Sequence, residues 1–90
     1  MYDFEWDSEK ARLNHRKHGV DFQDAIRVFL DPIRIEDDDW YPREQRWRTI
    51  GMVNDVVLLV VFTYREKRIR VISARKATKN ETQRYYDPTA

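Results

Sequence analysis

The sequence predicts an α+β domain with two N-terminal helices, a four-stranded antiparallel meander sheet and a C-terminal helix. Apolar residues recur with helical spacing up to residue 31 and alternate with a period of two from residue 33 onward. A helix-capping signature follows near residue 78. The 90-residue chain is 41% hydrophobic and 13% aromatic, which suffices for one packed core. We therefore expect a single domain over residues 1–90.

A short strand and a first helix are expected at the N-terminus. Phe4–Trp6 alternates apolar and acidic side chains, as an edge strand does. Asp7 or Ser8 can cap a helix that runs to His18. Gly19 ends this helix, because glycine readily adopts the left-handed conformation of a C-terminal cap.

A second helix is expected directly after the first. Asp21 is its N-cap, and its apolar face has the spacing i, i+3, i+4 and i+7. That face consists of Phe22, Ala25, Ile26 and Phe29. Asp31-Pro32 ends the helix, because the proline ring disfavours helical geometry at the residue before it.

Four strands are expected in the second half of the chain. Ile33 and Ile35 alternate with polar residues and indicate the first strand, which gives way to an acidic loop at Glu36–Asp39. Gln45–Val53 has the period of a second strand. Asn54-Asp55 then predicts a tight turn between antiparallel neighbours.

The last two strands and a helix complete the domain. Val56–Phe62 is apolar on both faces and therefore predicts a central strand. A further turn leads to the last strand, Arg68–Arg75. Thr78 and Glu81 have the spacing of a capping box, which predicts a final helix that ends at Tyr86.

Charge is distributed unevenly along the chain. Residues 1–42 hold six basic and eleven acidic residues, whereas residues 43–90 hold eleven basic and five acidic ones. Twelve of the 17 basic residues are arginine, the side chain suited to bidentate phosphate contact. A basic half indicates an anionic partner, and nucleic acid is the commonest. Mutual neutralisation of the two halves within the fold is the alternative.

The composition excludes several protein classes. Without cysteine the chain has no disulfide framework, no cysteine zinc site and no thiol nucleophile. Its longest apolar run, Val56–Phe62, is far shorter than the roughly 20 residues of a membrane span. The acidic N-terminus, with Asp3, Glu5 and Asp7, lacks the positive charge of a secretory signal. We expect a cytoplasmic protein that makes no membrane contact.

The sequence predicts no metal site and no cofactor. His15 and His18 lie three residues apart, and Glu36–Asp39 is a run of carboxylates. Neither group has a third ligand at a characteristic spacing. Gly19 and Gly51 stand alone, so the chain has no glycine-rich phosphate loop.

Basic residues gather on the later strands, namely Arg46, Arg48, Arg68, Arg70 and Arg75. Arg46 and Arg48 share one face of their strand, and Lys76 follows Arg75 at a strand end. An arginine within a strand reaches comfortably only toward solvent or an anion. Two interpretations remain open, namely a phosphate site and ordinary ion pairs with Glu44, Glu66 or Glu81.

The available residue types are sufficient for RNA cleavage. RNA carries its own nucleophile, the 2′-hydroxyl, so a ribonuclease needs only a base, an acid and positive charge for the phosphorane oxygens. Candidate titratable groups beside the arginines are Lys17, His18, Glu44, Tyr64, Tyr85 and Tyr86.

Residue patterns in both halves of the chain resemble the BrnT toxins. The N-terminal half has Phe4-Glu5-Trp6-Asp7, Asn14, Lys17-His18-Gly19, Phe22, Ala25, Val28-Phe29 and Asp31-Pro32. The C-terminal half has Glu44, Arg46-Trp47, Ile50-Gly51, the run from Arg70 to Thr78, Glu81 and Tyr85. The match covers about residues 4 to 85.

The resemblance implies a RelE-like fold and a type II toxin, a ribonuclease that arrests growth by cutting RNA. It implies as partner a BrnA antitoxin with a ribbon-helix-helix part. Operator DNA would be bound only by the complex of toxin and antitoxin, which represses their shared operon.

The resemblance also implies a catalytic site composed of Lys17, His18, Glu44, Arg46, Arg75 and Tyr85. We expect His18 or Glu44 to deprotonate the 2′-hydroxyl, and Lys17 or a tyrosine of the last helix to protonate the leaving group. Arg46 and Arg75 would hold the phosphate. Additional substrate contacts are expected from Arg48, Arg70 and Lys76. Thr82 and Gln83 depart from the family pattern, in which basic residues follow the acid of the last helix.

Other functions are compatible with the same residues. The main alternative is a non-catalytic module that binds nucleic acid or an antitoxin through its basic half. A third is a degenerate toxin whose fold survives only to bind the antitoxin. Trp6, Trp40 and Trp47 are expected as core or interface anchors, with base stacking as the alternative. Glu81 is expected to act as the acid of the capping box.

Overall fold

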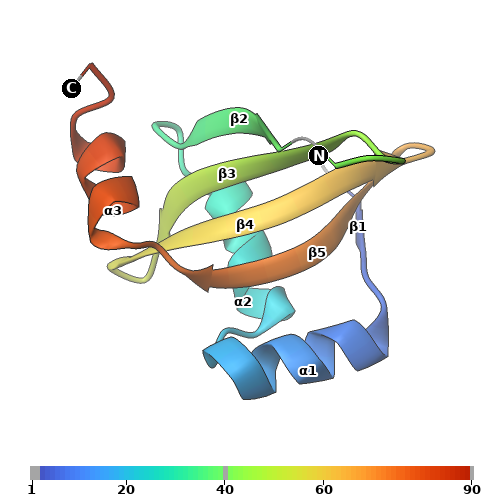
Figure 1. The fold of residues 1–90 in the computed structure, drawn as a ribbon. Coiled ribbons are helices and arrows are strands. Elements are labelled where there is room, and N and C mark those ends of the chain that lie inside the picture. Colours follow the sequence, from blue (N-terminus) through green and yellow to red (C-terminus); the bar gives the residue numbers. More distant parts are fainter. Residues whose placement is uncertain (1–2, 40, 90) are drawn as a thin grey trace.

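The computed structural model describes residues 3–39 and 41–89 and has an α+β architecture. Its elements in chain order are β1 (Phe4–Glu5), α1 (Ser8–His18), α2 (Phe22–Ala25), the 3-10 helix η1 (Ile26–Leu30), β2 (Ile35–Asp39), β3 (Arg46–Val53), β4 (Val56–Arg65), β5 (Arg68–Lys76) and α3 (Lys79–Tyr86). Helices α1 and α2 lie on one side of the sheet, and α3 follows directly from the end of β5 (Figure 1).

The sheet has five strands in the order β1-β5-β4-β3-β2. Strands β2 to β5 form the predicted antiparallel meander. The prediction of four antiparallel strands was wrong in one respect, because β1 adds a fifth strand parallel to β5, with Phe4 opposite Ile69. Between β1 and β5 the chain passes through α1, α2 and the other three strands. This long connection brings β5 back beside β1 in the same direction, so the pair is parallel.

The predicted acidic loop at Glu36–Asp39 was also wrong, since these residues belong to strand β2. This strand pairs antiparallel with β3, from Ile35 opposite Ile50 to Asp39 opposite Arg46. Charged residues are tolerated here because β2 is an edge strand, where acidic side chains also discourage unwanted pairing with another sheet.

The second predicted helix is divided into two kinds of helix. Only Phe22–Ala25 is α-helical, and Ile26–Leu30 is a 3-10 helix. Val28 of η1 packs tightly against Gly51 of β3. A Cβ atom at position 51 would lie only 2.4 Å from the Cγ2 of Val28. The absence of a side chain at Gly51 is therefore what allows η1 to lie this close to the sheet.

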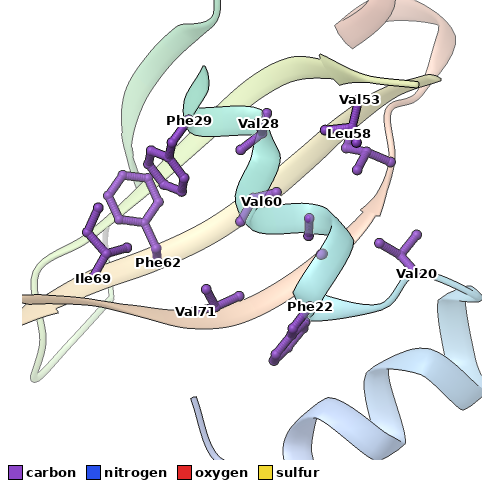
Figure 2. Packing of buried hydrophobic residues seen from close by; sticks show 12 residues of the cluster. Val20, Phe22, Val28, Phe29, Val53, Leu58, Val60, Phe62, Ile69 and Val71 are labelled. Carbon is purple, nitrogen blue, oxygen red and sulfur yellow. The ribbon is translucent and has the colours of Figure 1, made fainter. Parts of the chain in front are cut away.

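The main core lies between the helices and one face of the sheet (Figure 2). Phe22 and Val28 from the helical side meet Val60, Phe62 and other strand residues, and all four of these side chains are fully buried. A smaller cluster on the opposite face contains Ile50, Val57, Leu59 and Tyr85. This second cluster fixes α3 against the sheet.

Candidate functional site

The sheet face turned away from α1 and α2 carries a group of arginines, and we call it the open face. Side chains alternate along a strand, and Phe62, Val71 and Ala74 point into the helix-covered core. Their neighbours along each strand therefore point the other way. The basic residues of the open face are Arg46, Arg48, Arg70 and Arg75, with Arg65 and Arg68 beside the β4–β5 turn. Lys76 alternates away from Arg75 and is exposed.

Arg75 forms a bidentate ion pair with Glu81 of α3. Its Nη1 and Nη2 donate to the two carboxylate oxygens at 2.8 and 2.9 Å. The hydrogen bond from Arg75 is the largest cause of a lowered pKa of Glu81, which falls to about 2. The carboxylate is therefore ionised at neutral pH, and the predicted pairing of a strand arginine with Glu81 is present.

Arg46 lies at the opposite end of the open face, next to Glu44. Its Nε donates to the Glu44 carboxylate at 3.3 Å, and its guanidinium carbon lies 3.7 Å from the centre of the Tyr41 ring. Glu44 also lies 3.8 Å from Arg65. The sequence did not single out Tyr41, because an aromatic residue in a loop gives no signal of the cation that it stacks against.

Two further arginines, Arg70 of the open face and Arg84 of α3, are paired with carboxylates that the sequence analysis did not connect to them. Arg70 donates to Glu5 of β1 at 2.6 Å, so the added strand also supplies a counter-ion. Arg84 of α3 lies 2.7 Å from Asp37 of β2. The hydrogen bond from Arg84 is the largest cause of a lowered pKa of Asp37.

Arg48 differs from these arginines because it has no hydrogen-bonded carboxylate among the described residues. It lies directly opposite Asp37 in the β2–β3 ladder and contributes electrostatically to the lowered pKa of that residue. Its Nε atom is buried and has no hydrogen-bond partner within residues 3–39 and 41–89. A buried donor without a partner is unfavourable. The Arg48 side chain as a whole is half-buried and has no carboxylate bound to it among the described residues, so the rest of its guanidinium is available to an anion.

The structure separates the two arginines that were expected to share one phosphate. Arg75 pairs with Leu59, and Leu59 pairs in turn with Ile50 of β3. Arg46 lies four residues before Ile50, which corresponds to about 13 Å along the strand. Arg48 lies between Arg46 and Ile50 on β3, about 7 Å along the strand from Ile50, the residue level with Arg75. Arg48 and Arg75 therefore define the middle of the open face.

A row of paired residues links Arg48 to the edge of the sheet near α1. Arg48 pairs with Val61, and Val61 pairs with Ser73 of β5. The next pairs along the chain are shifted, which leaves Ile72 as an extra residue and produces a β-bulge. Bulges often redirect side chains next to functional sites. Here the bulge separates Ile72 and Ser73 from the regular alternation of the strand.

Lys17 and His18 lie at the sheet edge where this row ends. Both belong to the last turn of α1 and line a groove together with Ile72 and Ser73. Within the part of the chain that the structure describes, neither Lys17 nor His18 has an ion pair. The row thus has Arg48 at one end and a basic groove with an imidazole at the other.

Tyr85 occupies a different environment, on the buried side of α3. Its side chain is 4% exposed, and its hydroxyl donates a short hydrogen bond to Asp31. Burial, followed by this hydrogen bond, raises the pKa of Tyr85 to about 12. Burial opposes ionisation of Asp31 as well, but hydrogen bonds from Tyr85 and from the Met52 and Ile33 amides outweigh it and lower the pKa of Asp31. These contacts favour a structural role for Tyr85.

The tryptophans do not contribute to the open face where they are described. Trp6 and Trp47 pack against the main core, and Trp6 meets the ring of Phe22 edge-on. Trp40 lies outside the described residues. Within residues 3–39 and 41–89, no group of three His, Cys, Asp or Glu residues could hold a metal ion. No helix in the same residues has the length and apolar character needed to cross a membrane.

A family model described as "Ribonuclease toxin, BrnT, of type II toxin-antitoxin system" matches residues 6–81 of the chain. This range includes α1, the whole antiparallel meander and the first turn of α3. It therefore contains every arginine of the open face. A search of curated proteins found no match to the chain.

Proposed function

The chain belongs to the BrnT family of ribonuclease toxins of type II toxin-antitoxin systems, and from that premise we propose that it is a metal-independent endoribonuclease whose RNA lies on the open face. The reaction would be attack of a 2′-hydroxyl on the neighbouring phosphorus. The oxygen–phosphorus bond to the 5′-oxygen breaks, and the products are a 2′,3′-cyclic phosphate and a free 5′-hydroxyl. The 2′-hydroxyl proton is transferred to a base, and an acid supplies the proton of the leaving oxygen.

The observation that carries this proposal is the unsatisfied guanidinium of Arg48 in the middle of the face. Its buried Nε lacks a partner among the described residues, and Asp37 compensates its charge only from the neighbouring strand. A phosphate between Arg48 and Arg75 would pair with the rest of this half-buried guanidinium, which has no hydrogen-bonded carboxylate among the described residues. It would also place positive charge beside the oxygens on which negative charge develops in the phosphorane.

Candidates for the base and the acid lie on both sides of this position. His18 is supported by the row that connects Arg48 through Val61 to the groove of α1. Glu44, beside Arg46, is the alternative base at the other end of β3. Lys17 is the better placed candidate acid, because Tyr85 is buried and hydrogen-bonded to Asp31. Arg70 would contact a flanking phosphate, as a cation outside this centre. Lys76 alternates to the other face at the end of β5 and would contact only RNA that passes around this end of the sheet.

An antitoxin partner follows from membership of a type II family. We propose that it is a BrnA-type ribbon-helix-helix protein, that it covers the open face, and that operator DNA is bound only by the complex. Arginines gathered on one sheet face favour a partner that supplies acidic side chains there. Action on RNA in the cytoplasm is part of the same proposal.

The experiment that tests catalysis uses labelled RNA in EDTA and compares it with the same RNA carrying a single 2′-deoxy substitution at the site cleaved. We expect cleavage of the first RNA and none at the substituted position. The new 3′ end should resist phosphatase until mild acid opens the cyclic phosphate. RNA that is bound but stays intact in this assay would favour the non-catalytic binding module instead.

A second pair of variants assigns the base. His18→Gln should reduce cleavage by a factor on the order of 100 or more if His18 is the base, and Glu44→Gln should do so if Glu44 is. Equal and small effects of both substitutions would exclude these two residues as the base.

A further inference from the structure

Arg75 presents two different edges of its guanidinium group to its surroundings. One N–H of Nη1 and one of Nη2 donate to Glu81 at 2.8 and 2.9 Å. Nη1 also donates to the Lys76 carbonyl oxygen at 3.2 Å. A guanidinium has five N–H donors in a fixed plane. The Nε–H and the second N–H of Nη2 therefore remain, and they form a second fork on the adjacent edge.

This second fork has no hydrogen-bond partner among residues 3–39 and 41–89. The Arg75 side chain is 34% exposed. Among the described residues Arg48 Nε is the unpartnered side-chain nitrogen that is shut off from solvent, so the unpartnered Nε of Arg75 is reachable. Two parallel N–H donors match two oxygens of a phosphate in the same way as they match a carboxylate. The side chain can thus hold Glu81 and a phosphate at the same time.

Glu81 is itself held in place by the backbone of α3. It is the third residue of the helix, where its Oε1 accepts from the Thr78 amide at 2.8 Å while its own amide donates to the Thr78 hydroxyl at 3.2 Å. This capping box is complete, and the Glu81 side chain is 19% exposed. A carboxylate fixed at a helix N-terminus is a rigid support for the guanidinium that it binds.

We infer that Glu81 is a positioning residue, which holds Arg75 so that its free Nε–Nη2 fork faces an RNA phosphate on the open face. Glu81 does not touch the RNA in this arrangement. The inference rests on the proposed function and extends it, because it gives the capping-box acid a second role. It also explains why an ion pair at Arg75 is compatible with binding of a phosphate.

An opposite role for Glu81 can be stated from the same contact. If its carboxylate occupied the position that the RNA phosphate needs, Glu81 would compete with the substrate and removing its charge would increase activity. The two roles therefore predict effects of opposite sign on cleavage. This difference makes the inference testable with one substitution.

The test compares Glu81→Gln with Thr78→Ala, each in the full-length chain. Glutamine is accepted at the third position of a capping box, so Glu81→Gln retains the cap but removes the negative partner of Arg75. Thr78→Ala removes the hydroxyl of the cap but leaves the bidentate ion pair. Melting temperatures measured alongside cleavage rates show whether any loss of activity follows stability.

We expect Glu81→Gln to lower kcat/KM for RNA by about tenfold or more, the loss that a misplaced charge-assisted hydrogen bond produces. Thr78→Ala should change kcat/KM by less than about twofold at a temperature where both variants are folded. In an Arg75→Ala background, Glu81→Gln should have no further effect, because the side chain that it positions is absent.

Three results would overturn the inference, namely equal activity of the two single variants, faster cleavage by Glu81→Gln, and an undiminished effect of Glu81→Gln in the Arg75→Ala background. Failure of the proposed function gives a different result. In that case the wild-type protein leaves RNA intact under the conditions in which it is folded.

Discussion

The carboxamide of Asn14 pairs with the backbone of Ala74 as a neighbouring strand would. Its Nδ2 donates to the Ala74 carbonyl oxygen at 2.8 Å, and its Oδ1 accepts from the Ala74 amide at 3.1 Å. The same Nδ2 lies 3.2 Å from the carbonyl oxygen of Val20, beyond the end of α1. A single side chain therefore closes the edge of β5, fixes α1 beside it and holds the following turn.

We predict that Asn14→Ala destabilises the protein by about 2–3 kcal/mol, because it leaves the buried amide and carbonyl of Ala74 without partners. Urea unfolding followed by circular dichroism measures this change. Asn80→Ala in α3 is the control, since it makes the same replacement at an exposed side chain that forms no hydrogen bond within residues 3–39 and 41–89. Similar stabilities of the two variants would show that Asn14 does not support the β5 edge.

Tyr85→Phe separates a structural from a catalytic role of the hydroxyl. We expect a loss of about 1–3 kcal/mol in the free energy of unfolding, because Asp31 loses one charge-assisted hydrogen bond but retains those from two backbone amides. Cleavage of RNA per folded molecule should stay within about twofold of wild type. A loss of cleavage by two orders of magnitude without a loss of stability would restore Tyr85 as the general acid.

The ion pair of Glu81 predicts a specific dependence of stability on pH. Its pKa falls from 4.5 to about 2 on folding, so the folded state binds the proton less readily than the unfolded state does. The stabilisation is complete above pH 4.5 and is lost as the pH falls toward 2. Its size is on the order of 2 kcal/mol after allowance for solvent screening at the partly exposed Arg75.

Melting temperatures of wild type and Glu81→Gln between pH 6 and pH 2 measure this contribution. We expect the difference between the two proteins to be largest at the upper end and to shrink as the pH falls below 4.5. A difference that stays constant over the whole range would mean that the pKa of Glu81 is not lowered by folding.

Local signals in the sequence predicted most of the elements. Gly19 has a φ of 70° as the C-cap of α1, and Thr78 and Glu81 form the predicted capping box. The turn at Asn54-Asp55 has positive φ at both residues, as a tight hairpin requires. In each case the backbone geometry is determined by residues within four positions of one another, which is why the sequence alone was sufficient.

The missed features depend on contacts between distant segments. The edge strand expected at Phe4–Trp6 is present as β1, but no local signal predicts its parallel pairing with β5. Strand β2 includes Glu36–Asp39 only because β3 pairs with it. A propensity argument disfavours acidic residues in a strand and cannot include the partner that overrides it.

The candidate site was predicted in composition more than in arrangement. The arginines of the open face were identified from their strand positions, whereas Glu5, the carboxylate partner of Arg70, lies far away in the sequence. Arg48 was expected only to contact substrate. Its importance rests on the absence of a recorded partner among the described residues, a property that no sequence pattern contains.

The most direct test of the open face as the RNA-cleaving surface compares Arg48→Ala with Arg27→Ala. Arg27 is an exposed arginine of η1, which packs on the other face of the sheet, so both variants lose one positive charge. We predict that single-turnover cleavage of labelled RNA in EDTA falls at least about 100-fold in Arg48→Ala and less than about threefold in Arg27→Ala. Equal rates in the two variants would contradict the placement of the scissile phosphate on the open face.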